Sequence, residues 1–151
     1  MVCLADLQLS TVVGRVKGGY SNFCVANFCC PMAPSSTMRA LVCRKLGDPT
    51  QPFSDTSPIY VAQDYSRPEL SSPTCVRVKV LASSVNFATG LTIEGKYQER
   101  PPLPYVPGED FTGTVLEIGD RVSRFKAGDA VCGVVSTGAY AEELVADESK
   151  V

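Results

Sequence analysis

The chain contains no histidine, and none of its seven cysteines forms a pair with two residues between them. Zinc sites in proteins are built mainly from histidine and cysteine at such short spacings, so both absences count against a zinc site. Cys24, Cys29 and Cys30 lie close together, but without such partners we interpret them as incidental thiols. The odd number of cysteines and the absence of a clear secretory signal predict free thiols in a reducing compartment rather than a disulfide framework.

The sequence also lacks a long apolar run and a continuous basic stretch. A membrane-spanning helix needs about 18 or more consecutive apolar residues, and no such run occurs. Lysine and arginine are scattered singly and the formal net charge is −2, which does not suit the phosphate backbone of a nucleic acid. We therefore expect neither a membrane nor a nucleic acid as a partner. The composition, 44% hydrophobic and 20% charged over 151 residues, is that of one globular domain.

The first 37 residues have few charged side chains, namely Asp6, Arg15 and Lys17. They show no sustained amphipathic period, so we assign the domain to residues 38–151, which open with MRALVCRKLGDP. Residues 1–37 are either an extension from an alternative start or an organellar transit peptide, because they are poor in acidic residues. Their low Arg and Ser content favours the extension and a cytoplasmic protein. A transit peptide would place the protein in a plastid or mitochondrion.

Short apolar or alternating runs separated by turn residues predict a series of short β-strands. Residues 39–43 form the first expected strand, which ends at the turn signal Gly47-Asp48-Pro49. In residues 75–86, valines alternate with Arg77 and Lys79, the pattern of a strand with one solvent face. Three further strands are expected at residues 111–118, 128–135 and 139–146.

The connections between these strands are rich in proline or glycine. Residues 49–73 hold five prolines among Ser, Asp and Gln, so we predict a surface loop there. Residues 86–96 should form a short helix or turn, and the prolines of residues 101–108 leave only an extended connection. Many short strands with little helix predict a mainly β protein with short helices, built as a small, partly open barrel.

Glycines punctuate residues 103–133, LPYVPGEDFTGTVLEIGDRVSRFKAGDAVCG, at intervals that a strongly bent barrel requires. These glycines are Gly108, Gly113, Gly119, Gly128 and Gly133, and the residues expected to fill the interior are Val115, Val122, Phe125 and Val131. In this spacing the chain from Met38 to Val151 resembles the N-terminal GroES-like domain of the medium-chain dehydrogenase/reductase superfamily. Within that superfamily it is most similar to the zinc-free quinone oxidoreductase branch.

The resemblance implies a GroES-like, partly open β-barrel that is incomplete. In this superfamily a Rossmann domain with a glycine-rich turn follows the barrel and binds the dinucleotide. No such motif occurs here, because the stretch from Gly133 to Gly138 is not followed by a helix pattern. The comparison therefore implies a domain truncated before the Rossmann domain. The missing parts would leave strand edges and an apolar face exposed, which predicts self-association.

The resemblance also bears on metal binding. Zinc-dependent members hold the catalytic metal with a Cys and with the His of a Gly-His-Glu-x-x-Gly motif. Here that motif reads Gly108-Glu109-Asp110-Phe111-Thr112-Gly113, and Asn86 stands at the position of the Cys. Neither the imidazole nor the thiolate is present, and the four-cysteine lobe that binds structural zinc has no counterpart. The resemblance therefore implies chemistry without zinc.

In the quinone oxidoreductase branch, an Asn and a Tyr line the cleft beside the nicotinamide. Residue-by-residue matching carries these roles to Asn86 and Tyr97, as candidate catalytic and cofactor-binding residues. Two further positions of the motif differ, since its Asp is Thr89 and its first Tyr is Leu91. The Asn86 amide is suited to fixing a carboxamide or a quinone oxygen, and Tyr97 can stack and donate. The structural alternatives are a turn-stabilising Asn and a half-buried Tyr at a strand edge.

Glu109 and Asp110 suggest a carboxylate pair for acid–base chemistry. Adjacent residues of a strand point to opposite faces, so we do not expect them to share a site. Asp110 is expected to form hydrogen bonds near the cleft, and Glu109 to lie on its rim.

The resemblance implies the substrate-side domain of an NADPH-dependent, metal-free quinone or enone oxidoreductase. Hydride transfer requires the substrate and the nicotinamide to be held together, so we expect this chain to be inactive alone. The alternative is a non-catalytic truncated isoform that binds and modulates full-length subunits. A co-chaperonin would share the barrel, but the proline-rich composition of residues 49–73 is wrong for its glycine-rich mobile loop.

Overall fold

The computed structural model describes residues 36–151. The expected N-terminal segment, with Cys3, Cys24, Cys29 and Cys30, therefore lies outside the described residues, apart from Ser36 and Thr37. The elements in chain order are β1 (Thr37–Cys43), β2 (Ile59–Ser66), β3 (Cys75–Ser83), α1 (Phe87–Glu94), β4 (Asp110–Ile118), β5 (Ala130–Val134), β6 (Glu143–Asp147) and the 3₁₀ turn η1 (Glu148–Lys150). No helix within residues 36–151 is long and apolar enough to cross a membrane.

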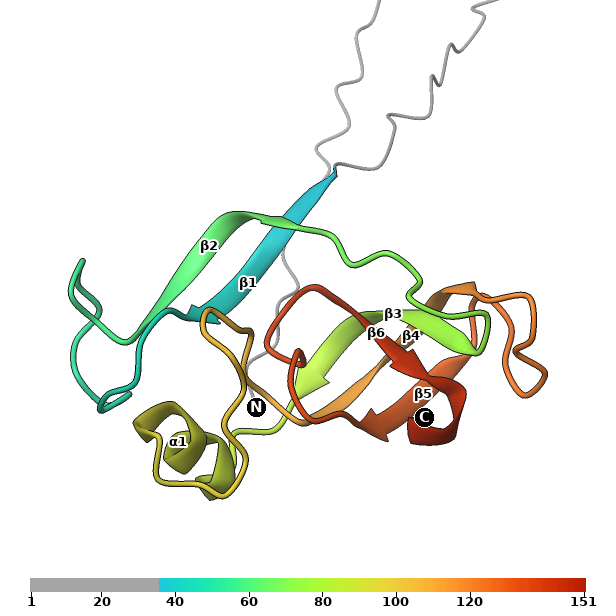
Figure 1. Ribbon diagram of the computed structural model, residues 1–151. Coiled ribbons are helices and arrows are strands. Elements are labelled where there is room, and N and C mark those ends of the chain that lie inside the picture. Colours follow the sequence, from blue (N-terminus) through green and yellow to red (C-terminus); the bar gives the residue numbers. More distant parts are fainter. Residues whose placement is uncertain (1–35) are drawn as a thin grey trace, which may run out of the picture.

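The strands form two antiparallel sheets (Figure 1). One sheet contains β1 and β2, and the other has the order β5-β4-β3-β6. In Figure 1 the β1–β2 pair stands to one side of the four-stranded sheet, and α1 lies near the end of β3. The two sheets do not close into a barrel. The expected mainly β, partly open and incomplete GroES-like architecture is confirmed.

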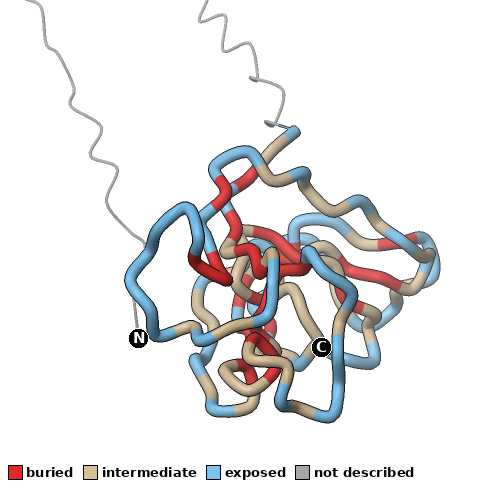
Figure 2. The backbone as a smooth tube through the Cα atoms, turned by 60° about the vertical axis from the view of Figure 1, so that its left-hand side comes forward, coloured by how far each residue is buried: buried red, intermediate tan, exposed pale blue. Residues whose placement is uncertain are grey.

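The main core lies on one face of the four-stranded sheet. Val76 and Val78 of β3 pack with Phe111 and Val115 of β4 and with Val131 of β5, all buried. Val122 and Phe125, which the sequence also placed in the interior, are partly buried against this cluster. Figure 2 shows the buried segments gathered in the middle of the molecule. The β3–β4 register shifts twice, and such bulges bend a sheet around its core.

Residues 139–142 join the two sheets. The backbone N–H of Leu41 donates to the carbonyl of Tyr140 over 2.8 Å, and the N–H of Val80 donates to the carbonyl of Glu142 over 2.9 Å. The Glu142 carboxylate also pairs with the Arg39 guanidinium at 2.7 Å. This stretch thus lies between β1 on one side and β3 on the other.

The loop predicted for residues 49–73 is wrong in its middle, because residues 59–66 form β2. Pro58 and Pro68 flank this strand and do not interrupt it, so every N–H of the strand remains available to the ladder. β1 supplies the partner, with Ala40 opposite Ala62 and Cys43 opposite Ile59. Proline content therefore predicted the loops on both sides but hid the strand between them.

The other expected elements are confirmed with shifted ends. The strands expected at 39–43, 75–86, 111–118 and 128–135 correspond to β1, β3, β4 and β5, and the short helix in 86–96 is α1. The last expected strand begins at Glu143 instead of Ala139, because residues 139–142 cross from β3 toward β1, where Ala141 pairs with Ala40. Cys43 and Cys75 are buried free thiols and Cys132 is an exposed one, so the free-thiol prediction holds for the described part of the chain.

Gly113 of β4 provides a test of this packing. A methyl group at Gly113 would overlap the backbone carbonyl oxygen of Lys79 on β3. We expect Gly113→Ala to lower the free energy of unfolding by about 1–3 kcal/mol or more, the usual cost of overpacking, in urea titrations of the chain.

Gly90→Ala is the matched control, because a methyl group there meets nothing within 4 Å. Alanine loses less backbone entropy than glycine in a helix, so this variant should gain about 0.5–1 kcal/mol. An unchanged stability of Gly113→Ala would contradict the close approach of β3 and β4.

Candidate functional site

Asn86 caps the N-terminus of α1. Its backbone is extended, with φ −115° and ψ 166°. Its side-chain oxygen Oδ1 accepts hydrogen bonds from the backbone N–H of Thr89 at 2.8 Å and from the Thr89 hydroxyl at 2.9 Å. An Asn in this position satisfies a backbone donor that the first turn of a helix leaves free. The structural alternative for Asn86 is therefore realised, and it fixes the orientation of the amide group.

The amide nitrogen of Asn86 faces Asp110 at the start of β4. Nδ2 donates to Oδ2 of Asp110 at 3.4 Å, and the Ser84 hydroxyl donates to the same oxygen at 2.5 Å. The Ser83 hydroxyl donates to the backbone carbonyl of Asp110 at 2.7 Å. Asp110 thus forms the hydrogen bonds expected of it. The second N–H of the Asn86 amide has no partner among residues 36–151, and it remains free to donate to a ligand.

Tyr140 belongs to the same cluster, although the sequence analysis did not single it out. Its hydroxyl donates to the backbone carbonyl of Ser84 at 2.8 Å. Its ring lies against Gly108, where φ is 94° and a Cβ atom would overlap the ring. The two hydrogen-bonded residues are 56 positions apart, and no local pattern in the sequence pairs them.

Tyr97 lines a cavity of about 440 Å³ together with Glu109. Val134, Ser136 and Lys150 are among the other lining residues, and Asn86 is not one of those that the structure places there. Glu109 therefore faces this cavity while its neighbour Asp110 faces Ser84 and Asn86. These adjacent carboxylates therefore have different neighbours, although the charges of both act on Tyr140. The dipeptide joins the Tyr97 cavity to the Asn86 cluster.

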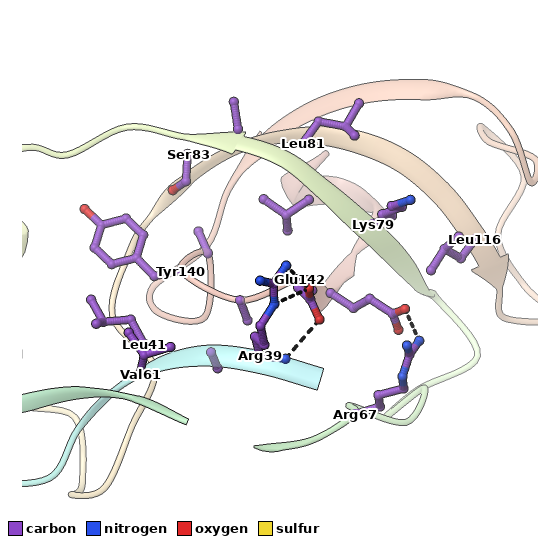
Figure 3. A pocket seen from close by; sticks show the side chains of 16 residues that line it. Arg39, Leu41, Val61, Arg67, Lys79, Leu81, Ser83, Leu116, Tyr140 and Glu142 are labelled. Atoms are coloured by element: carbon purple, nitrogen blue, oxygen red, sulfur yellow. Dashed lines mark hydrogen bonds and ion pairs between the residues drawn. The ribbon is translucent and has the colours of Figure 1, made fainter. Parts of the chain in front are cut away.

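A larger cavity, of about 820 Å³, lies between β1, β3 and residues 139–143 (Figure 3). Its two acidic residues are both engaged in ion pairs, Glu142 with Arg39 and Glu143 with Arg67. Val61, Leu81 and Leu116 line it and are exposed, as an incompletely closed barrel requires. Tyr140 stands at the edge of this cavity, on the side of Ser83.

The donor set at the Asn86 cluster does not fit a zinc ion. The Asn86 oxygen is taken up by Thr89, and the Asp110 carboxylate accepts from Ser84 and Asn86. Within residues 36–151, no group of three or more His, Cys, Asp or Glu side chains is arranged to hold a metal ion. Chemistry without a metal stays a prediction.

The family model for the alcohol dehydrogenase GroES-like domain matches residues 72–151, more than half of the chain. The chain therefore belongs to the alcohol dehydrogenase GroES-like domain family. Among curated proteins it is 49% identical over 81 residues to "Quinone oxidoreductase-like protein 2" of Mus musculus, covering 54% of this chain. The predicted resemblance to this domain and to quinone oxidoreductase-like proteins is confirmed.

Two solved structures extend the comparison. The quinone oxidoreductase from Coxiella burnetii is 26% identical with a TM-score of 0.64, covering 75% of this chain and 35% of that chain. The quinone oxidoreductase from Thermus thermophilus, solved alone and in complex with NADPH, is 26% identical with a TM-score of 0.58, covering 75% of this chain and 31% of that chain. Our chain spans 23% of the length of the mouse relative.

Burial raises the pKa of Tyr140 above its usual value of 10, and the nearby carboxylates of Glu109 and Asp110 raise it further, while a hydrogen bond with Thr89 opposes them. A raised pKa means that the neutral phenol persists to higher pH. We expect the difference in tyrosinate absorbance between the wild-type chain and Tyr140→Phe to have its midpoint at a higher pH than that of an ordinary tyrosine. A tyrosine that ionises at or below its usual pH would contradict this environment.

Proposed function

We propose that this domain forms the substrate side of a metal-free, NADPH-dependent quinone or enone oxidoreductase. The observation that carries the proposal is the Asn86 amide, held by Thr89 at its oxygen and by Asp110 at its nitrogen, with one N–H left free. The similarity to quinone oxidoreductase-like proteins supports quinones as the substrate class.

The free N–H of Asn86 is suited to a carbonyl oxygen that gains negative charge. Two-electron reduction of a quinone places charge on such an oxygen, and a pre-oriented donor stabilises that charge without having to reorganise. Thr89 and Asp110 already fix the Asn86 amide, so binding of a ligand costs little side-chain conformational entropy at Asn86. A neutral donor also avoids the repulsion that Asp110 would impose if it faced the substrate itself.

Tyr97 and the cavity of about 440 Å³ supply the apolar and stacking part of the proposed site. This volume lies within the range of small-molecule sites, roughly 300–1,000 Å³. The Tyr97 side chain is partly exposed, so its ring is accessible to a flat ligand. An aromatic ring beside a quinone gains from offset stacking, and its hydroxyl adds a second donor.

The described residues do not fit the pyrophosphate of a dinucleotide. Such a group binds at a helix N-terminus with free N–H groups. The N-terminus of α1 is already capped by Asn86, and the carboxylate of Asp110 lies beside it and would repel a phosphate. We propose NADPH as the reductant of the whole protein, by similarity to the Thermus thermophilus relative, with the residues that hold its pyrophosphate outside 36–151. Asn86 and Tyr97 stay candidates for contact with its nicotinamide.

The test replaces Asn86 by Ser, which caps helices as well as Asn but has no amide. We expect Asn86→Ser to weaken duroquinone binding to the nitrogen-15-labelled chain about 2- to 10-fold, the worth of one hydrogen bond. The affinity is followed by the backbone amide chemical shifts of Thr89 and Tyr97, which both proteins contain. Duroquinone is chosen because its fully methylated ring does not add thiols such as the exposed Cys132.

Gln51→Ser is the matched control, since it removes an exposed amide far from the site in the sequence. It should leave the affinity unchanged, and both variants should stay within about 0.5 kcal/mol of the wild-type stability. Equal affinity of Asn86→Ser and the wild type would remove the basis of the proposal.

The native protein gives a second test. We expect protein captured with an antibody against residues 103–133 to be heavier than 16.1 kDa and to oxidise NADPH when duroquinone is added, because the match covers only 23% of the length of the mouse relative. A 16.1 kDa species without this activity would favour the modulator alternative. In that case, adding the chain to the longer enzyme should change its rate, whereas an inert fragment leaves the rate unchanged.

A further inference from the structure

The polar groups around Asn86 form a connected chain of hydrogen bonds. Asn86 is bonded to Asp110 at its nitrogen and to Thr89 at its oxygen, and Asp110 accepts from the Ser84 hydroxyl. Tyr140 is connected to this cluster through Ser84, because its hydroxyl donates to the Ser84 carbonyl at 2.8 Å. The nitrogen end of the Asn86 amide is therefore linked to the phenol of Tyr140 through Asp110 and Ser84.

The position of Tyr140 is itself fixed by the fold. Its carbonyl accepts from Leu41 of β1 at 2.8 Å, and its N–H donates to the carbonyl of Pro107 at 3.0 Å. Its ring packs in the cluster of Ala40, Val42, Ala62 and Val106. Figure 3 shows the ring extending from the segment before β6 toward the end of β3 at Ser83. Because these hydrogen bonds fix the Tyr140 backbone on two sides, the phenol keeps a constant position relative to the segment that carries Asn86.

We propose that Tyr140 is a positioning residue for the Asn86 amide: by holding Ser84, which donates to the same Asp110 carboxylate oxygen as Asn86, it sets the direction of the free N–H that a quinone oxygen would meet. The identity of the ligand, a quinone, rests on the proposed function. The positioning of the Asn86 amide by Tyr140 does not depend on it. Tyr140 acts through Ser84 and Asp110, and no contact with the substrate is required of it.

The electrostatics favour a phenol that stays a donor. The titratable groups near the hydroxyl are Glu109 and Asp110, and both are acidic, so their charges oppose formation of a phenolate. The neutral phenol therefore persists through the physiological pH range, and the bond to the Ser84 carbonyl needs that proton. The positioning should thus be independent of pH over this range.

The experiment compares Tyr140→Phe with Tyr65→Phe in the full 151-residue chain. Tyr65 packs against the same cluster, and within the described part of the chain its hydroxyl has no hydrogen bond, so the two changes remove the same atom from similar surroundings. We expect Tyr140→Phe to speed hydrogen exchange of the Asn86 side-chain amide and of the Thr89 backbone N–H about 2- to 10-fold, the worth of one hydrogen bond. Amides of β3 and β4 should not change, and Tyr65→Phe should resemble the wild type throughout.

Duroquinone affinity separates the two proposals. Tyr140→Phe should weaken duroquinone binding by a factor of about 2 to 10 while Tyr65→Phe does not. Unchanged exchange at Asn86 and Thr89, or equal acceleration of every amide, would overturn the positioning role. If the wild-type chain binds no duroquinone but Tyr140→Phe still frees the Asn86 amide, then the quinone function is refuted and the positioning role stands.

Discussion

The arrangement of this domain depends on backbone pairing along residues 139–142. One side of this stretch bonds to β1 through Leu41 and the other to β3 through Val80. The Arg39–Glu142 ion pair accompanies it, but exposed pairs of this kind contribute little, about 0–1 kcal/mol. The backbone hydrogen bonds of residues 139–142, which we call the joint, hold the two sheets together. The larger cavity lies beside the joint, between β1 and β3.

The candidate site uses the same joint. Tyr140 contributes its backbone to the pairing and its phenol to the polar cluster, so the segment that carries Asn86 is anchored to the fold at the point where the sheets meet. Gly108 makes this possible, because any side chain there would occupy the space of the tyrosine ring. A glycine that the sequence suggests for the bend of a barrel therefore also serves the site.

Much of the fold follows from local patterns. Alternation in residues 75–80 and the glycine spacing in 103–133 predict the strands and the bent sheet, because both depend on neighbouring residues alone. β2 was not predicted, because the prolines on both sides of it indicate a loop. Its stability comes from pairing with β1, and the composition of residues 49–73 carries no sign of that pairing. Tyr140 was likewise not predicted as part of the site. It contacts Ser84 only because the fold brings together residues that are 56 positions apart.

For Asn86 the sequence left two roles open, and the structure shows why. The cap is a local interaction with Thr89, whereas the direction of the amide depends on Asp110, 24 positions later. A residue can satisfy both requirements at once, so the choice between cap and ligand was never exclusive. The sequence pattern did not show that Asp110 contacts Asn86. This contact fixes the amide nitrogen and leaves a single N–H free.

The joint at residues 139–142 also orders events during synthesis of the chain. Arg39 and Glu142 are 103 positions apart, so β1 leaves the ribosome long before its second neighbour exists. Until then β1 has only β2, and an isolated pair of strands is marginal in water. Pairing over such separations is slow compared with local contacts. Within the described residues, β1 is thus the first strand to be synthesised and among the last to gain all of its hydrogen-bonded neighbours.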